Sequence, residues 1–138
     1  MKNFLLLILI APVFGVSQYI TIPDEMFEKA LVEYGFDDAI DGKVLIENIN
    51  TVDSLHIYYR GITDLTGIEG FTALISLRCG GNKLKSLDVS KNTALTQLFC
   101  ISNSLTSLDL SKNTALTDLK CDDNKFDCKA IKAKYNLK

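Results

Sequence analysis

The sequence predicts a solenoid of stacked coils with a parallel β-sheet along one side, and three observations favour this fold class. A 21-residue unit is written twice in succession, as LKSLDVSKNTALTQLFCISNS (84–104) and LTSLDLSKNTALTDLKCDDNK (105–125), with identical residues at 14 of 21 positions. Leucines recur at fixed places in the unit, as in stacked repeats rather than closed globules. A shorter pattern, LxxLxCxxN, begins at Leu74 and returns at Leu95 and Leu116.

The first 17 residues have the pattern of a secretory signal peptide. Lys2 supplies a basic start, an almost unbroken apolar run covers residues 4–16, and small residues at 15–17 suit cleavage after Ser17. The apolar run is shorter than the ~20 residues that a membrane-spanning helix needs. We therefore expect a secreted protein, extracellular or periplasmic, with no membrane span after signal removal and with cell-surface association as an open alternative.

Residues 18–51 are expected to form an N-terminal cap. Pro23 is tolerated in the first turn of a helix, and the acidic Asp24 and Glu25 suit the positive end of the helix dipole. Gly35 provides a stop. The residues that recur at helical spacing are Phe27, Ala30, Leu31 and Tyr34. We expect this amphipathic helix to dock its apolar face on the open first coil.

Within this cap, the run DDAIDG has two interpretations. A calcium loop of the EF-hand type beginning at Asp37 would have Asp41 and Gly42 in the right places. However, Ala39 and Asn48 fall where carboxylate ligands belong, and flanking helices are not evident. We favour a polar turn, with calcium binding at Asp37 and Asp41 as the open alternative.

Residues 52–126 are expected to form the coils. The first coil is degenerate and carries the pattern as Val52, Leu55, Ile57, Arg60 and Ile62. In the later Leu-x-Cys segments the two named residues point inward and their neighbours outward, and successive strands pair into a short parallel sheet on the concave face. The asparagine that follows can satisfy backbone groups where the chain leaves the strand. Return segments of the form LxxLDLSKN supply a second apolar wall on the other side.

Residues 127–138 are expected to form a C-terminal helical cap. Lys129 stands where an inward leucine would continue the repeat, so the coil pattern fails there. Asp127 can cap a short helix in which Ile131 and Tyr135 share one face. Such a helix would cover the last coil and protect the exposed end of the sheet.

The tandem pattern LxxLxCxxNxLxxLDLxxN resembles the bacterial leucine-rich repeats of the nested 21-residue type, called IRREKO repeats. The segments IPDEMFEKALVEYG (22–35) and VDSLHIYYRGITDLTGIEGFTAL (52–74) are similar to the start of secreted, internalin-like leucine-rich-repeat proteins of Gram-negative bacteria. This resemblance implies a leucine-rich-repeat solenoid and a secreted or surface-associated module that binds other molecules rather than a catalyst.

Four cysteines in a secreted chain raise the question of disulfides. Cys79, Cys100 and Cys121 occupy one inward position on successive coils, about 4.8 Å apart, with parallel Cβ directions. This arrangement favours a ladder of buried thiols over bridges. Cys128 alone breaks the ladder, so a bridge, if one forms, should join it to Cys121. The one histidine, His56, points away from the ladder, so no metal site is expected.

Composition and motifs disfavour several other classes of function. Signal removal leaves 14 Lys and Arg against 17 Asp and Glu, a net charge of −3, whereas nucleic-acid binding needs a basic stripe. No motif for a nucleophile and no Gly-rich phosphate loop is present, so neither an enzyme nor a cofactor is expected. Asp88 and Asp109 repeat one period apart, which indicates a solvated or turn-stabilising role. The oligomeric state stays open.

Differences between the two copies of the repeat indicate a ligand-binding face. Four of the seven differing pairs lie on or beside the outward strand face, namely Gln97/Asp118, Phe99/Lys120, Ile101/Asp122 and Ser102/Asp123. Across the coils, this face places aromatic and aliphatic side chains beside an arginine and rims them with charge, as binding surfaces do. Gly80 and Gly81 should leave a notch. The predicted ligand-binding patch consists of His56, Tyr58, Arg78, Phe99 and Ile101.

Two classes of ligand fit this patch. A protein ligand is the first hypothesis, since the predicted apolar side chains gather on one face. A surface glycan is the alternative, because Tyr58, Tyr59 and Phe99 could stack on sugar rings. A third interpretation is that scattered surface apolar residues bind nothing.

Overall fold

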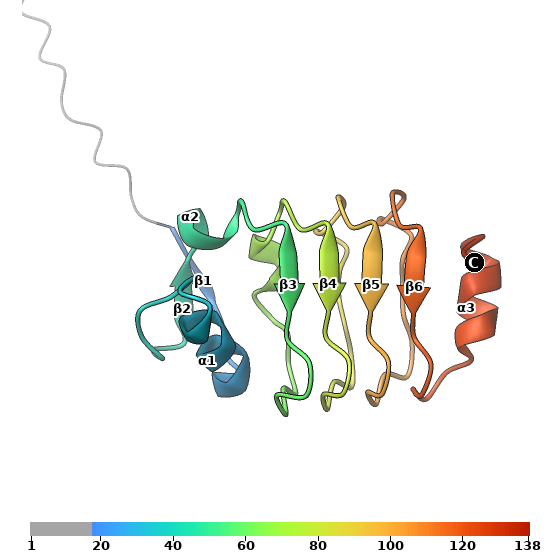
Figure 1. Ribbon diagram of the computed structural model, residues 1–138, viewed down its shortest axis with the longest axis horizontal. Helices are drawn as coiled ribbons and strands as arrows, with labels where there is room; N and C mark the ends of the chain where they lie inside the picture. The colour runs from blue at the N-terminus through green and yellow to red at the C-terminus, as the bar shows by residue number, and fades with distance from the viewer. Residues whose placement is uncertain (1–17) are drawn as a thin grey trace, which may run out of the picture.

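The computed structural model describes residues 18–138, which form an elongated molecule with a cap at each end (Figure 1). The expected signal peptide lies outside the described residues. Over the range 18–138, no helix combines the length and the apolar character that crossing a membrane requires.

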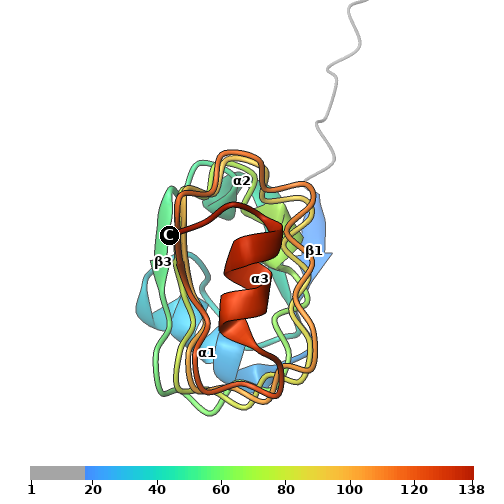
Figure 2. The same ribbon diagram turned by 90° about the vertical axis from the view of Figure 1, so that its right-hand side faces the viewer.

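Four short parallel strands form one side of the coils, as the repeat predicts. They are β3 (Ser54–His56), β4 (Ser76–Arg78), β5 (Gln97–Phe99) and β6 (Asp118–Lys120), and they pair in chain order. The register of the strands places equivalent leucines next to each other, namely Leu55, Leu77, Leu98 and Leu119. Seen along the axis of the solenoid, the coils follow nearly the same path (Figure 2). Each repeat position therefore lies beside its counterpart in the next coil.

A thin core lies between the sheet and the return segments. The strand side contributes Leu98 and Cys100, and the return side contributes Val89 and Leu105, all with 0% exposure. Burial of one such leucine contributes about 1.5–3 kcal/mol, so a few leucines in every coil can support a core only two walls thick. Among the described return segments, regular structure is limited to the 3₁₀ helix η1 (Ile68–Gly70).

An asparagine ladder on the strand side connects neighbouring coils, as expected for this residue. The Nδ2 atom of Asn103 donates to the carbonyl oxygens of Cys79 and Cys100, both at 3.1 Å. Its Oδ1 atom accepts from a backbone N–H of the preceding coil at 3.1 Å. Asn82 and Asn124 make corresponding bonds one coil before and one coil after. These side chains satisfy buried backbone groups at the turn.

A second asparagine ladder lies on the return side, where the sequence analysis assigned no role to the Asn of the SKN motif. The Nδ2 atom of Asn92 donates to the carbonyl oxygens of Ile68 and Phe71, at 2.8 and 3.1 Å. One coil later, Asn113 donates to the carbonyl oxygens of Val89 and Asn92, at 2.8 and 3.0 Å. Each coil is thus joined to the previous one on both walls.

The N-terminal cap contains the expected helix and a strand pair that was not predicted. The helix α1 (Glu25–Glu33) buries Phe27 and Leu31, while Tyr34, expected on the same apolar face, is 44% exposed. The strands β1 (Tyr19–Thr21) and β2 (Lys43–Leu45) pair antiparallel, and the short helix α2 (Ile46–Ile49) follows. Together these elements cover the first coil (Figure 1).

A buried carboxylate organises the loop between α1 and β2. Glu28 is 2% exposed, and its Oε1 atom accepts hydrogen bonds from the backbone N–H groups of Asp41, Gly42 and Lys43, at 2.9, 2.6 and 3.0 Å. Burial together with nearby carboxylates raises the pKa of Asp37 in the same loop. The described residues contain no cluster of three or more potential metal-ligating side chains. The three hydrogen bonds to Glu28 centre the turn between α1 and β2 on this carboxylate.

The C-terminal cap is the helix α3 (Cys128–Lys134), whose N-cap Asp127 accepts a hydrogen bond from the backbone N–H of Lys129 at 2.9 Å. A disulfide joins Cys121 to Cys128, the pair that the sequence singled out as the candidate bridge. The expectation of a buried thiol is therefore wrong for Cys121. It is correct for the two free cysteines of the ladder, Cys79 and Cys100, which are buried.

Candidate ligand-binding face

The side chains that point outward from β3 to β6 form one continuous surface, which we call the strand face. Its rows, read from β3 to β6, are Ser54, Ser76, Gln97 and Asp118; then His56, Arg78, Phe99 and Lys120; and, just beyond the strands, Tyr58, Gly80, Ile101 and Asp122. All five residues of the predicted patch therefore lie on this face. His56 is exposed, as expected, whereas the other four are half-buried or, for Phe99, buried.

Phe99 is the main correction to the predicted patch. We expected an exposed ring, yet its side chain is only 8% exposed. The guanidinium of Arg78 lies 5.0 Å from the ring centroid and the ammonium of Lys120 lies 4.3 Å from it. These residues belong to the strands on either side of β5, so two cations cover one aromatic ring. Such cation–π contacts are worth about 0.5–2 kcal/mol each, depending on how desolvated they are.

Gln97 fixes the position of Arg78. Its Oε1 atom accepts hydrogen bonds from Arg78 Nε at 3.0 Å, from Arg78 Nη2 at 2.8 Å and from Ser76 Oγ at 2.8 Å. Its Nε2 atom donates to Asp118 Oδ2 at 3.0 Å. A chain of hydrogen bonds therefore runs across β4, β5 and β6. It holds the guanidinium through a neutral amide rather than through a carboxylate.

Neither cation over Phe99 has an acidic partner. Residues 18–138 contain two ion pairs, Lys43 with Asp41 at 3.3 Å and Arg60 with Glu33. Arg78 is half-buried and Lys120 is exposed, and neither lies within ion-pair distance of a carboxylate in that range. Two cations therefore lie beside Asp118 in the middle of the strand face, and Gln97 holds the guanidinium of Arg78 in position.

An aromatic cluster lies next to this positive region. His56 and Tyr58 have ring centroids 6.4 Å apart, and Tyr58 and Tyr59 are again 6.4 Å apart. Tyr59 is 79% exposed and has a left-handed backbone with φ of 51°. Its ring lies over Gly81, where an added Cβ atom would be 2.2 Å from ring carbons. We expected Tyr59 to contribute only to the glycan alternative, yet it is the most exposed large apolar residue of this cluster.

The notch expected at Gly80 and Gly81 is filled. A Cβ atom added to Gly80 would lie 3.0 Å from Ile101 Cγ1 and 3.5 Å from Tyr58 Cδ1. The two side chains therefore close over the glycine and form a continuous apolar strip. The absence of a side chain at Gly80 allows Tyr58 and Ile101 to approach, rather than leaving a hollow for a ligand.

The N-terminal cap extends this surface in a way that the sequence analysis missed. Arg60 forms its ion pair with Glu33 of α1 and lies 5.8 Å from the ring centroid of Tyr34. The hydrogen bond between Arg60 and Glu33 raises the pKa of Arg60 and lowers the pKa of Glu33. The hydroxyl of Tyr34 also donates to the carbonyl oxygen of His56. The one available signal was Arg60 at a repeat position that holds Asn in later coils.

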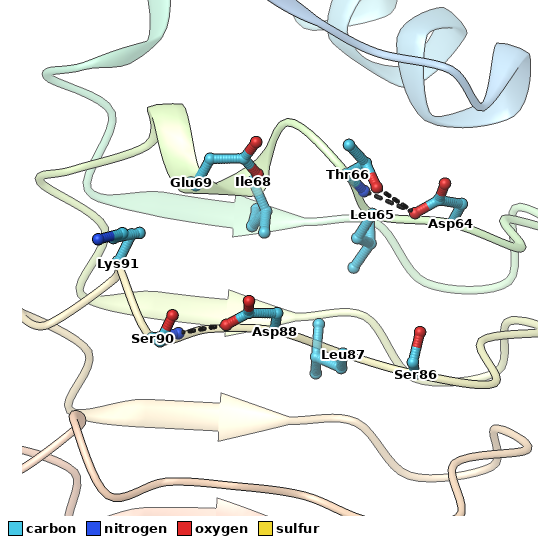
Figure 3. Close-up of a pocket in the computed structure, with 10 residues that line it drawn as sticks. All are labelled: Asp64, Leu65, Thr66, Ile68, Glu69, Ser86, Leu87, Asp88, Ser90 and Lys91. Carbon is cyan, nitrogen blue, oxygen red and sulfur yellow. Dashed lines mark hydrogen bonds between the residues drawn. The ribbon is translucent and has the colours of Figure 1, made fainter.

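The return side carries shallow polar cavities. One of them has a volume of about 350 Å³. Among the residues that line it, Asp64 accepts a hydrogen bond from Thr66 and Asp88 accepts one from Ser90 (Figure 3). The hydrogen bonds from Ser90 lower the pKa of Asp88. Asp109 Oδ1 accepts the corresponding hydrogen bond from the backbone N–H of Ser111 at 2.9 Å. The turn-stabilising role expected for Asp88 and Asp109 is confirmed, since each carboxylate is engaged in a local turn.

The free thiols do not form a reactive centre. Burial raises the pKa of Cys100 to about 12 and also raises the pKa of Cys79. A thiol with such a pKa is almost entirely protonated at neutral pH, and the thiolate is the nucleophilic form. Both residues therefore act as small apolar side chains of the core.

Comparison with known proteins gives sequence matches over part of the chain. No protein-family model matches it. Internalin J of Listeria monocytogenes is 42% identical over 71 residues, which is 51% of this chain and 8% of that protein. The solved functional domain of InlJ from Listeria monocytogenes, described as including a cysteine ladder, is 39% identical with a TM-score of 0.70, over 81% of this chain and 26% of that one. This chain thus spans a small part of the length of either.

More distant structures share the fold alone. Internalin C2 of Listeria monocytogenes has a TM-score of 0.71 at 19% identity, over 89% of this chain and 57% of that chain. The internalin inlF of the same species has a TM-score of 0.67 at 20% identity, over 75% of this chain and 31% of that chain. These neighbours have the same arrangement of leucine-rich coils.

Proposed function

The chain is an internalin-like leucine-rich-repeat protein, and on this premise we propose that it is a secreted or surface-associated binding module whose strand face contacts another protein. One observation carries the proposal. An aromatic cluster, an apolar strip and two cations without an acidic partner among residues 18–138 share one side of the sheet. Rigid aromatic side chains next to arginine are enriched at the centres of protein interfaces.

The proposed contact surface keeps the predicted residues but changes their roles. Tyr58, Tyr59 and Ile101 would supply apolar contact area, and His56 would extend it toward the N-terminal cap. Phe99 would not contact the ligand itself but would position Arg78 and Lys120 through its cation–π contacts. The backbone of this region is held by the sheet and by the asparagine ladder, so a ligand would meet a surface that is already ordered.

A capture experiment with two variants tests this function. Immobilised wild-type protein, incubated with extracellular fluid from its native surroundings, should retain specific proteins that mass spectrometry identifies. Tyr58→Ala combined with Ile101→Ser should abolish this capture, because it removes most of the apolar strip. Thr93→Ala on the return side should capture as the wild type does. If the strand-face variant retains the same proteins at the same yield, the strand face is not the contact surface.

Glycan recognition by the same face is the second candidate. The specific observation in its favour is the exposed ring of Tyr59 beside the half-buried ring of Tyr58. Aromatic rings that lie side by side can stack on successive sugars. Competition by soluble polysaccharide separates the two candidates: a glycan ligand predicts loss of capture when the polysaccharide is added, whereas a protein ligand predicts none.

A further inference from the structure

We propose that Arg78 and Lys120 form a receptor for carboxylate groups, so that the partner of the strand face presents an acidic, extended peptide segment. This inference rests on the proposed binding function of the strand face and names the chemistry of the ligand. It begins from the two cations over Phe99, which have no acidic partner among residues 18–138.

Arg78 is positioned in advance for such a ligand. Two of its nitrogen atoms, Nε and Nη2, donate to Gln97 Oε1 at 3.0 and 2.8 Å, and its guanidinium also lies against the ring of Phe99. The Nη1 group has no hydrogen-bond partner in the described part of the chain. A half-buried guanidinium usually has a carboxylate partner, because its charge is costly to desolvate without one. Here a neutral amide orients it and leaves its charge for a ligand.

Lys120 supplies the second positive group on the other side of the same ring. Its ammonium lies 4.3 Å from the centroid of Phe99, while the Arg78 guanidinium lies 5.0 Å from it. Alternate side chains of an extended peptide project in the same direction about 7 Å apart. Two carboxylates spaced in this way can reach both cations. The cation–π contacts with this ring keep the two cations near each other. Without the ring, two flexible side chains of like charge would separate.

The neighbouring charges limit where the acidic segment can lie. Asp118 is engaged by Gln97 at 3.0 Å, which directs one of its oxygen atoms toward the amide. Asp122 and Asp123 are exposed beyond β6 and would repel a ligand there. The favourable region therefore runs from Lys120 back toward Arg78 and the aromatic cluster. A peptide with acidic residues followed by apolar residues fits this region, because its carboxylates would lie at Lys120 and Arg78 and its apolar side chains at the aromatic cluster.

The state of Phe99 favours a peptide over an acidic polysaccharide. Sugar recognition by an aromatic ring uses an accessible ring face, whereas the ring of Phe99 is only 8% exposed and has cations 5.0 and 4.3 Å from its centroid. The strip of Tyr58 and Ile101 suits aliphatic side chains of a peptide. We therefore assign the ligand chemistry to a protein segment that combines carboxylates with apolar side chains.

The test is an NMR titration of the ¹⁵N-labelled protein with unlabelled hexaglutamate peptide. Addition of the peptide should shift the Arg78 Nε–Hε signal and the backbone amides of Phe99 and Lys120, and higher salt should weaken the effect. Arg78→Gln and Lys120→Gln should each raise the dissociation constant about tenfold. Lys125→Gln, which removes a charge outside the strand face, should change it less than twofold. Arg78→Lys should give an intermediate value, since it keeps the charge and loses the planar fork.

Each contrary outcome has a defined meaning. Equal binding of hexaglutamine, or unchanged affinity in both Arg78→Gln and Lys120→Gln, would overturn the carboxylate receptor. Tighter binding of hexagalacturonate than of hexaglutamate would overturn the choice of a peptide ligand. Because Lys120 is exposed, Lys120→Gln should fold normally. This variant therefore still tests the proposal if Arg78→Gln is unstable. If Arg78→Gln and Lys120→Gln both capture the same proteins as the wild type, the carboxylate receptor is refuted. The proposed protein-binding function of the strand face would still hold.

Discussion

Asp24 and Thr63 are 39 positions apart in the chain, yet Asp24 Oδ2 accepts hydrogen bonds from both the backbone N–H and the hydroxyl of Thr63, each at 2.8 Å. The other oxygen, Oδ1, accepts from the backbone N–H of Phe27 at 2.9 Å and so caps α1. A single carboxylate thus starts the cap helix and joins it to the first coil.

We expect Asp24→Asn to lower the free energy of unfolding at neutral pH by about 1.5–3 kcal/mol, as for other hydrogen bonds to charged groups. Asparagine has one acceptor oxygen and cannot serve both Phe27 and Thr63. Burial by itself raises the pKa of Asp24, but the hydrogen bonds from Thr63, Phe27 and Asp64 outweigh it and leave the pKa below its usual value. This stabilisation is therefore present above the unfolded-state pKa of about 3.9 and is lost as pH falls through the lower folded-state pKa.

Denaturant unfolding between pH 2 and pH 7 would measure this effect. The stability difference between wild type and Asp24→Asn should shrink as the pH falls below about 4. Asp53→Asn removes the same charge from an exposed residue and should produce little change. A constant difference over the whole range would mean that the ionised carboxylate is not what joins the cap to the coil.

Glycines at positions 67 and 61 provide a matched pair for testing how the cap docks. Both have left-handed backbones, with φ of 104° at Gly67 and 73° at Gly61, so alanine carries a conformational cost at either site. At Gly67 an added Cβ would also lie 2.2 Å from Ile22 Cδ1 and 2.9 Å from the carbonyl oxygen of Thr21, whereas nothing lies within 4 Å at Gly61. The difference between the two variants therefore reports contact with the cap together with the greater backbone cost of alanine at the φ of Gly67.

We expect Gly61→Ala to destabilise the protein by about 1 kcal/mol and Gly67→Ala by at least about 1 kcal/mol more, because β1 must move. Thermal unfolding would give both values. Hydrogen exchange should further show faster exchange of the amides of β1 and β2 in Gly67→Ala but not in Gly61→Ala. Equal melting temperatures in the two variants would contradict this close approach of the cap.

Glu28 should be essential for the loop that connects α1 to β2. Glu28→Gln keeps the shape of the side chain but replaces the charged acceptor of three backbone N–H groups, and we expect a loss of about 1–3 kcal/mol. The amides of Asp41, Gly42 and Lys43 should then exchange faster with solvent. Glu25→Gln changes an exposed carboxylate of the same helix and serves as the control. Equal protection in both variants would show that another group holds the loop.

The inward positions of the coils could be predicted because the repeat fixes them twice. Leu98 and Leu119 occupy the same place in successive units, and the structure pairs them directly in the sheet. An inward side chain contacts its own counterpart in the next coil, so copied apolar residues indicate the core. The alternation of a strand then determines which side chains point outward.

The packing of the outward side chains could not be predicted in the same way. Strand alternation directs Phe99 outward, but it does not say that Arg78 and Lys120 would lie over its ring. That arrangement depends on the rotamers of long side chains from neighbouring strands. Likewise, β1 and β2 are three residues each, too short for a readable alternation, and their pairing depends on α1 between them.

The disulfide between Cys121 and Cys128 ties α3 to the last coil and should contribute about 2.5 kcal/mol of stability, as expected for a closed loop of this short length. Alkylation of the denatured protein without reductant should modify two cysteines, Cys79 and Cys100, and four after reduction. In the native protein both should react slowly at pH 8, because burial raises the pKa of Cys100 to about 12.

Thermal unfolding links that bridge to the docking of the C-terminal helix. The double variant Cys121→Ser and Cys128→Ser should melt at a lower temperature than the oxidised wild type, since removing the cross-link lets the last coil and α3 separate in the unfolded chain. Reductant should lower the melting temperature of the wild type and leave that of the double variant unchanged, which separates the effect of the bridge from that of the serines. Modification of all four cysteines without reductant would show that no disulfide holds the C-terminal cap, leaving packing and the hydrogen bond from the Tyr135 hydroxyl to Asp109 Oδ1 at 3.1 Å.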